Sequence, residues 1–278
     1  MQWSRGVARG RADGGVRRPG PAEPTSLAHA PRPGNLVRRV DPTPQAPSSR
    51  VRVLVKAPRK IEAVLFDLDE TLHARERSVE RFARRLHAEA SLDVSEADFV
   101  ATVLDRDQRG RRPTEGLYTW LATHFDLGKT AEEVVHAYRT TAWDCPVLFP
   151  DARETLRRLR PLKLALVTNG SELSQAAKVA NSGLDRLTDY VAISGVLGLR
   201  KPDPAIFHAT CTQLDVDPSR CVMVGDSPEH DVAGGRGAGM RTIWIARAPW
   251  PDGRPRDYDG AVSCVADVVP LVRRWATS

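Results

Sequence analysis

The 278-residue chain has no long apolar run and no closely paired cysteines. A membrane-spanning helix needs about 18 or more consecutive apolar residues. No segment approaches that length, so we expect no association with a membrane. The cysteines are few, widely spaced and outside any CxxC pair: Cys145, Cys211, Cys221 and Cys264. This spacing indicates neither a zinc site nor a disulfide framework. It is typical of proteins from a reducing compartment, and we therefore predict a cytoplasmic location.

Acidic residues are scarce in the first 60 positions, which contain thirteen Arg or Lys residues and three Asp or Glu. That segment carries a net charge of +10, which leaves −4 of the chain's total of +6 for the remaining residues. The rest of the chain is thus mildly acidic, and its charge gives no reason to expect nucleic-acid binding. Whether the basic segment holds an acidic partner stays open.

Residues 1–58 also lack a sustained apolar period, and they contain nine Pro and six Gly. Such a segment buries too little surface to offset the entropy lost on ordering, so we predict a disordered tail. It has no continuous apolar stretch, which excludes a secretory signal peptide, and its Pro and Gly content disfavours the amphipathic helix of a transit peptide. A translation start farther downstream, near Val51 or Val53, also stays open.

The apolar run Ile61–Phe66 predicts a buried strand, and two acidic residues follow it. Asp67 and Asp69 cannot both be core residues, so the chain must turn there and leave both carboxylates at the carboxyl end of the strand. In open parallel sheets that edge binds ligands. Taken alone, the pattern fits a solvated acidic turn equally well.

Helical spacing replaces strand spacing after Leu72. Four helical stretches are expected: residues 78–90, a helix from Ser95, a stripe over residues 117–125, and a helix from Thr130, which forms a capping box with Glu133. Four helices without a strand between them predict a separate small domain at residues 74–147. Its aromatic residues are expected to form its own core: Trp120, Phe125, Tyr138 and Trp143.

Two arginines lie at the junction of this helical insert and the first strand. Most arginines of the insert fit solvated helix faces. Arg75 and Arg77 differ, because they come just after the acidic pair. We treat both as candidate contacts to an anionic substrate.

Strands alternate with helices from residue 151 onward. The expected strands are residues 162–167, 190–193, 221–224 and 242–245. The expected helices after them are residues 172–182, 205–214, 232–238 and 266–275. This alternation predicts an α/β fold, a Rossmann-like parallel sheet with helices on both faces.

Clusters of small polar or charged residues follow these strands. They are Thr168-Asn169-Gly170, Lys201, Asp226-Ser227 and Asp231. The carboxyl ends of parallel strands share one edge, so we expect these residues to converge with the acidic pair. Carboxylates at such short distances from one another repel, and a bound cation offsets the repulsion. Oxygen ligands of this kind suit Mg²⁺, and the hydroxyl, amide and ammonium donors suit the oxygens of a phosphoryl group.

Four stretches resemble, in order and spacing, the four motifs of the haloacid dehalogenase-like hydrolase superfamily. They are Asp67-Leu68-Asp69-Glu70-Thr71-Leu72, Thr168-Asn169-Gly170, Lys201-Pro202, and Gly225-Asp226-Ser227 through Asp231. The resemblance covers about residues 61–275. It implies a catalytic core at residues 59–73 and 148–278 and an α-helical cap at residues 74–147. Among such proteins the chain looks closest to small phosphatases and pyrimidine-nucleotidase-like members.

The resemblance implies distinct roles for the acidic residues. Asp67 is the nucleophile and a Mg²⁺ ligand. Asp69 is the general acid/base and gives the metal its backbone carbonyl. Asp226 is a further Mg²⁺ ligand, while Asp231 orients the metal's waters or the nearby lysine.

It also implies roles for the remaining motif residues. Thr168 and Asn169 hold the phosphoryl oxygens, and Lys201 neutralises charge between the nucleophile and the phosphate. Gly170 and Ser227 support the site without direct contact.

The function implied is Mg²⁺-dependent hydrolysis of a small phosphomonoester through an aspartyl-phosphate on Asp67. Dehalogenases resemble the chain but lack an acid at the position of Asp69, which favours a phosphatase. Phosphomutases resemble it in the core, although many have Gly in place of Glu70. A non-catalytic binding protein on this fold also stays open. The expected partner is a small phosphorylated metabolite, and the expected oligomeric state is a monomer or a homodimer.

Overall fold

The computed structural model describes residues 60–110 and 114–277. The predicted disordered tail at residues 1–58 lies outside these residues. No helix within the described part of the chain is long and apolar enough to cross a membrane.

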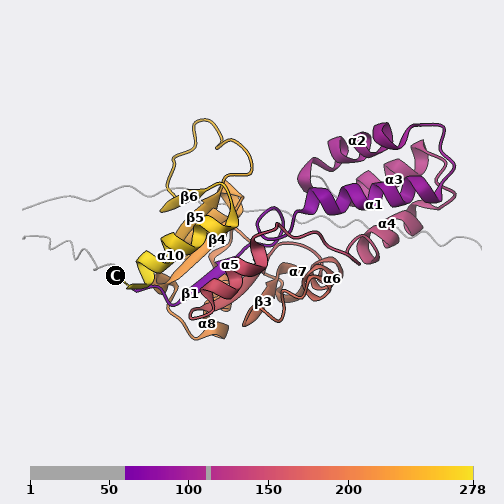
Figure 1. The fold of residues 1–278 in the computed structure, drawn as a ribbon. Coiled ribbons are helices and arrows are strands. Elements are labelled where there is room, and N and C mark those ends of the chain that lie inside the picture. The colour runs from indigo at the N-terminus through magenta and orange to yellow at the C-terminus, as the bar shows by residue number, and fades with distance from the viewer. Residues whose placement is uncertain (1–59, 111–113, 278) are drawn as a thin grey trace, which may run out of the picture. The chain divides into compact units, whose positions relative to one another are not determined.

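The described residues contain a six-stranded parallel sheet with the order β3-β2-β1-β4-β5-β6 (Figure 1). The strands are β1 (Ala63–Phe66), β2 (Lys163–Thr168), β3 (Tyr190–Ile193), β4 (Cys221–Gly225), β5 (Arg241–Ile245) and β6 (Gly260–Val262). In the centre, Phe66 of β1 pairs with Leu166 of β2 and with Val224 of β4. The strand order reverses between β1 and β4, and ligands bind outside the carboxyl ends of strands at such a point.

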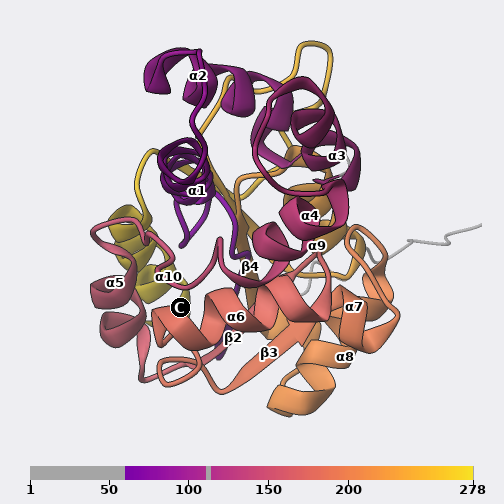
Figure 2. The same cartoon turned by 90° about the vertical axis from the view of Figure 1, so that its right-hand side faces the viewer.

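Helices pack on both faces of the sheet. On one face are α5 (Ala152–Leu159), α6 (Glu172–Ser182) and α10 (Val268–Thr277), and on the other is α8 (Pro204–Leu214). Figure 2 shows α5 beside α10, where Arg273 donates to the carbonyl oxygen of Arg158 at 3.2 Å. The predicted fold class is confirmed.

The central strand shows why its sequence is continuously apolar. Val64 and Phe66 belong to the cluster on the side of α5 and α10, whereas Ala63 and Leu65 belong to the cluster on the side of α8. All four side chains are fully buried. A strand covered on both faces needs apolar residues at every position rather than at alternate ones.

Four α-helices lie between β1 and α5 in the described part of the chain. They are α1 (Arg75–Glu89), α2 (Glu96–Asp107), α3 (Thr114–His124) and α4 (Ala131–Thr140). The predicted capping box is present, because Thr130 and Glu133 each accept a hydrogen bond from the other's backbone N–H. An apolar cluster of the insert includes buried Tyr138 and Trp143, with Trp120 and Phe125 packed against it. The aromatic residues form the expected core.

Several short elements were not expected, and one helix was misplaced. Strand β6 and the one-turn helix α7 (Ser194–Leu197) are too short to give a periodic pattern. The helix expected at residues 232–238 instead begins with a π-helical turn, Pro228–Ala233, and continues as α9 (Gly234–Gly237). The wide turn carries Asp231, and a hydrophobic pattern does not distinguish it from ordinary helix.

Candidate active site

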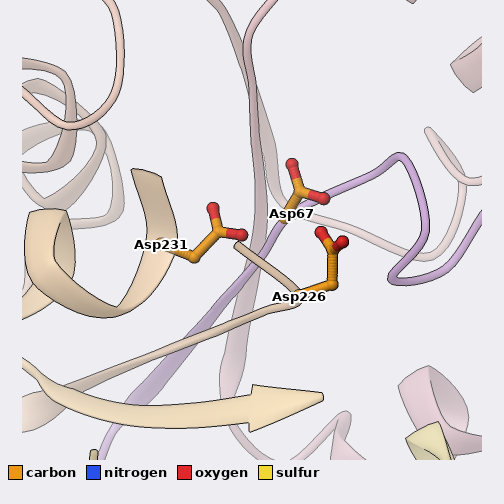
Figure 3. Close-up of side chains that lie close together, drawn as sticks. All are labelled: Asp67, Asp226 and Asp231. Atoms are coloured by element: carbon orange, nitrogen blue, oxygen red, sulfur yellow. The ribbon is translucent and has the colours of Figure 1, made fainter. Parts of the chain in front are cut away.

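Three carboxylates meet at the carboxyl ends of β1 and β4. Asp67 directly follows β1, Asp226 directly follows β4, and Asp231 lies in the π-helical turn. Figure 3 shows their side chains directed toward one another. Each offers an oxygen within 4.8 Å of the others. The backbone N–H of Asp67 donates to the carbonyl oxygen of Val224 at 2.9 Å, so the pairing of the two strands continues to the site.

Ser227 and Gly225 allow Asp231 to reach this cluster. The backbone N–H of Ser227 donates to Asp231 Oδ2 at 2.9 Å, and Ser227 Oγ accepts from the N–H of His230 at 3.1 Å, which caps the turn. A Cβ atom at Gly225 would overlap the Asp231 carboxylate. Glycine at this position therefore makes room for the acid.

The ammonium of Lys201 lies between two of the carboxylates. Its Nζ donates to Asp67 Oδ1 and to Asp231 Oδ1, both at 2.6 Å, and the side chain is 2 % exposed. Asn169 holds the backbone of Lys201 through two hydrogen bonds of 2.9 Å: its Nδ2 donates to the carbonyl oxygen of Lys201, and its Oδ1 accepts from the N–H of Lys201. The structure thus directs the Asn169 side chain to Lys201, while a contact from Asn169 to a phosphoryl oxygen stays a prediction.

The electrostatics of this cluster favour an added cation. Burial, with the nearby charge of Asp231, raises the pKa of Asp67 to about 7 despite Lys201. Burial and the charge of Asp67 raise the pKa of Asp226 to about 8. Burial alone would lower the pKa of Lys201, but the carboxylates of Asp231 and Asp67 raise it above its ordinary value.

The donor set fits a divalent metal ion. When all are ionised, the three carboxylates and Lys201 carry a net charge of −2. Mg²⁺ would neutralise this charge, and it prefers oxygen ligands from one or two carboxylates together with water and substrate phosphate. Both oxygens of Asp231 already accept hydrogen bonds, from Lys201 and from the backbone of Ser227. Asp67 and Asp226 are therefore the better placed ligands.

The side chain of Asp69 is held apart from the three clustered carboxylates. Glu70 adopts a left-handed conformation with φ +58°, and its N–H donates to the carbonyl oxygen of His73 at 2.8 Å, which turns the chain after Asp69. Lys178 Nζ lies 3.0 and 2.7 Å from the two Asp69 oxygens, and His73 Nδ1 lies 2.7 Å from Oδ1. Burial opposes ionisation of Asp69, but Lys178 and His73 hold its pKa well below the ordinary range.

Gln175 connects Asp69 to the end of β2. Its Nε2 donates to Thr168 Oγ1 and lies 3.3 Å from Asp69 Oδ2. Gly170 has φ +153°, and a Cβ atom there would lie 2.8 Å from Cγ of Gln175, so glycine is needed for this approach. Buried Thr168 thus stands at the site, with its hydroxyl already accepting a hydrogen bond.

Reasoning from the sequence missed His73, Gln175 and Lys178. The signal for the latter two was present in α6, where both polar side chains lie on the buried face that also carries Val179. Helix α6 directly follows Thr168-Asn169-Gly170, so polar residues on its inner face were candidates for the site.

The two candidate arginines have different surroundings. Arg75 is buried, and its guanidinium bonds both oxygens of Asp107 and the hydroxyl of Tyr138 at 2.9 Å. This commits Arg75 to the interior of the insert and gives no support to a substrate contact. Arg77 is exposed and lines a cavity of about 220 Å³ together with Phe149 and Arg247. Its contact with substrate stays a prediction.

Comparisons with known proteins agree with the motifs. Residues 61–239 match the haloacid dehalogenase-like hydrolase family. The chain is 32 % identical over 214 residues to a glyceraldehyde 3-phosphate phosphatase of Methanopyrus kandleri, covering 72 % of this chain and 90 % of that protein. It is 41 % identical over 107 residues to a phosphoserine phosphatase of Thermus thermophilus, covering 38 % of this chain and 43 % of that protein.

Solved structures show the same fold. A phosphatase of this superfamily from Thermococcus onnurineus has 30 % identity and a TM-score of 0.53, covering 76 % of this chain and 98 % of that one. A 2-haloacid dehalogenase from Pseudomonas syringae has 26 % identity and a TM-score of 0.55, covering 78 % and 100 %. The expectation of a hydrolase is confirmed, and the chain belongs to the haloacid dehalogenase-like hydrolase family.

Proposed function

We propose that this protein is a Mg²⁺-dependent phosphatase that hydrolyses a small phosphomonoester through an aspartyl-phosphate on Asp67. One observation carries the proposal. The buried carboxylate of Asp67 lies at a strand end beside Lys201 and Asp226, and a second acid, Asp69, follows two residues later. The phosphatases among the relatives support hydrolysis of a phosphomonoester.

Asp67 and Asp226 would hold the metal, together with the backbone carbonyl of Asp69. The ion would neutralise negative charge on the phosphoryl oxygens and so reduce their repulsion by the nearby carboxylates. Asp231 keeps Lys201 in place. The Lys201 ammonium can then donate to a phosphoryl oxygen beside the nucleophile, where negative charge must be stabilised.

In the first step a carboxylate oxygen of Asp67 attacks phosphorus. The bond between phosphorus and the ester oxygen breaks, and that oxygen takes a proton from the carboxyl group of Asp69, leaving as an alcohol. In the second step water attacks phosphorus and gives a proton to Asp69. The bond from phosphorus to Asp67 breaks, which releases inorganic phosphate and restores both side chains.

The two steps need Asp69 in different protonation states. The structure favours the ionised form, because Lys178 and His73 hold the pKa of Asp69 low. That form accepts the proton from water in the second step. A bound phosphoryl group adds negative charge nearby, and like charge raises the pKa of a carboxyl group. Substrate binding therefore favours the acid form that the first step requires.

The relatives support a small substrate. The relatives' names cite phosphorylated compounds of low molecular weight: glyceraldehyde 3-phosphate, phosphoserine, N-acylneuraminate 9-phosphate and ribulose 1,5-bisphosphate. We propose a small phosphorylated metabolite for this chain as well. Dehalogenation is the second candidate, since solved dehalogenases share the fold. The acid at Asp69 favours hydrolysis of a phosphoester, whose leaving oxygen needs a proton.

Hydrolysis of para-nitrophenyl phosphate by the purified protein tests the proposal. We expect activity that EDTA abolishes and Mg²⁺ restores. Asp67→Asn should lower it by orders of magnitude, because the nucleophile is lost. The matched control is Asp252→Asn, at an exposed position, which should behave as the wild type. Full activity of Asp67→Asn would refute the assigned nucleophile.

A further inference from the structure

Lys178 is a buried ammonium whose part in the two proposed steps, as described so far, is only to favour the ionised form of Asp69. It projects from α6, and 3 % of the residue is exposed. Its Nζ lies 3.0 and 2.7 Å from the two oxygens of Asp69. Burying an ammonium group is costly unless it is paired. The pairing of Lys178 is with the residue proposed as general acid/base rather than with the metal-binding carboxylates.

The ammonium of Lys178 is itself fixed from the helical insert. Nζ lies 4.1 Å from the centre of the Trp143 ring, which attracts a cation to its face. Trp143 is fully buried, and its carbonyl oxygen accepts from Asn181 Nδ2 at 2.9 Å. Asn181 lies on α6, like Lys178. Helix α6 thus holds Trp143 by its backbone and its ring, and the ring in turn restricts where the ammonium can lie.

The other side of Asp69 is held by a second anchored group. The His73 ring contacts Asp69 through Nδ1, and its Nε2 lies 2.8 Å from Ser78 Oγ. The same Ser78 oxygen accepts from the N–H of Val147 at 2.9 Å, where the chain leaves the insert. The carboxylate of Asp69 is therefore oriented by groups whose own positions depend on both connections between the insert and the sheet.

We propose that Lys178 is a positioning residue for the general acid/base: resting on the Trp143 ring, it holds the Asp69 carboxyl group where it can deliver a proton to the leaving oxygen. The inference rests on the proposed phosphatase function and deepens it. The ammonium also favours the ionised form of Asp69, an effect that the charge of a bound phosphoryl group opposes. The loss of Lys178 therefore impairs proton delivery because the carboxyl group is no longer held in its orientation. If Lys178 only stabilises the fold, its loss affects all substrates alike.

Two phosphate esters with similar rings separate these roles. Phenyl phosphate has a poor leaving group, which needs a proton as the ester bond breaks. The leaving group of para-nitrophenyl phosphate is stable as an anion and needs little help. The value of kcat/KM reports the step in which the ester bond breaks. The ratio of kcat/KM for the two esters does not depend on the fraction of enzyme that is folded.

We expect Lys178→Met to lower kcat/KM for phenyl phosphate by about tenfold or more beyond its effect on para-nitrophenyl phosphate, since general acid catalysis contributes about 10²–10⁴-fold. Lys178→Gln, which keeps an N–H donor without the charge, should shift the ratio in the same direction. Lys178→Arg, which keeps the positive charge, should leave the ratio close to that of the wild type. The matched control is Lys163→Met, because Lys163 donates to the backbone carbonyls of Leu214 and Asp215 at the opposite end of β2. It should leave the ratio unchanged.

The outcomes are distinct. An equal loss on both esters, or no loss, in Lys178→Met would overturn the positioning role while leaving the phosphatase proposal intact. A wild-type protein that hydrolyses neither ester in the presence of Mg²⁺ would overturn the phosphatase proposal and this inference with it.

Discussion

Replacing Asp226 by Asn should stabilise the metal-free protein at alkaline pH. Burial and the charge of Asp67 raise the pKa of Asp226 from an ordinary value of 3.8 to about 8. Between these values the folded state keeps a proton that the unfolded chain has released. Because the folded state binds more protons, the free energy of unfolding falls as the pH rises through this window, and the penalty is complete above it.

The size of the penalty follows from the shift. About four pKa units correspond to about 6 kcal/mol at about 1.36 kcal/mol per unit. The repulsion is shared with Asp67, whose pKa burial raises to about 7, and protonating either group relieves the other. Asparagine carries no charge at any pH. We therefore expect the stability of Asp226→Asn relative to wild type to increase by about 2–3 kcal/mol between about pH 5 and about pH 8.

Urea unfolding of the metal-free protein at the two pH values, followed by tryptophan fluorescence, measures this difference. The control Asp252→Asn should leave the free energy of unfolding unchanged at both pH values, because that side chain is exposed. Added Mg²⁺ should reverse the order at about pH 8, since a ligand that binds the folded state stabilises the wild type but finds a weakened site in Asp226→Asn. An equal effect of Asp226→Asn at both pH values would refute the reasoning.

Two further predictions concern Arg75 and Gly225. Arg75→Met leaves Asp107 buried without its partner and should lower the free energy of unfolding by about 3–5 kcal/mol, whereas the double variant with Asp107→Leu should recover most of it in urea unfolding. If the double variant raises KM strongly while remaining stable, Arg75 contacts the substrate after all. Gly225→Ala places a Cβ atom against the Asp231 carboxylate and should lower kcat by about tenfold or more, because Lys201 loses a partner. Wild-type kcat in a steady-state assay would contradict this role of the glycine.

The parts of the site that could be predicted depend on strand ends. Asp67, Lys201, Asp226 and Asp231 converge because parallel strands share a carboxyl edge, a rule that needs no knowledge of the strand order. The continuous apolar run of β1 likewise shows that both faces of that strand are covered. Periodicity and motif position suffice for these features.

The parts that could not be predicted depend on contacts between distant residues. Lys178 reaches Asp69 across 109 positions, and Asn169 reaches the backbone of Lys201 across 32. Position in the sequence made Arg75 a candidate substrate contact, but its partner Asp107 lies 32 residues away on another helix. No local pattern distinguishes an arginine or lysine that pairs with an acidic residue of the protein from one that binds an anionic substrate.

The covalent role of Asp67 is the central claim, and trapping the intermediate tests it most directly. Turnover of a phosphomonoester in the presence of Mg²⁺ is quenched with acid, and the protein is reduced with borohydride and analysed by peptide mass spectrometry. Reduction of an aspartyl-phosphate converts that aspartate to homoserine. The account predicts homoserine at position 67, and none in Asp67→Asn. Continued turnover with no modification at position 67, or a phosphoryl group trapped on another side chain, would contradict it.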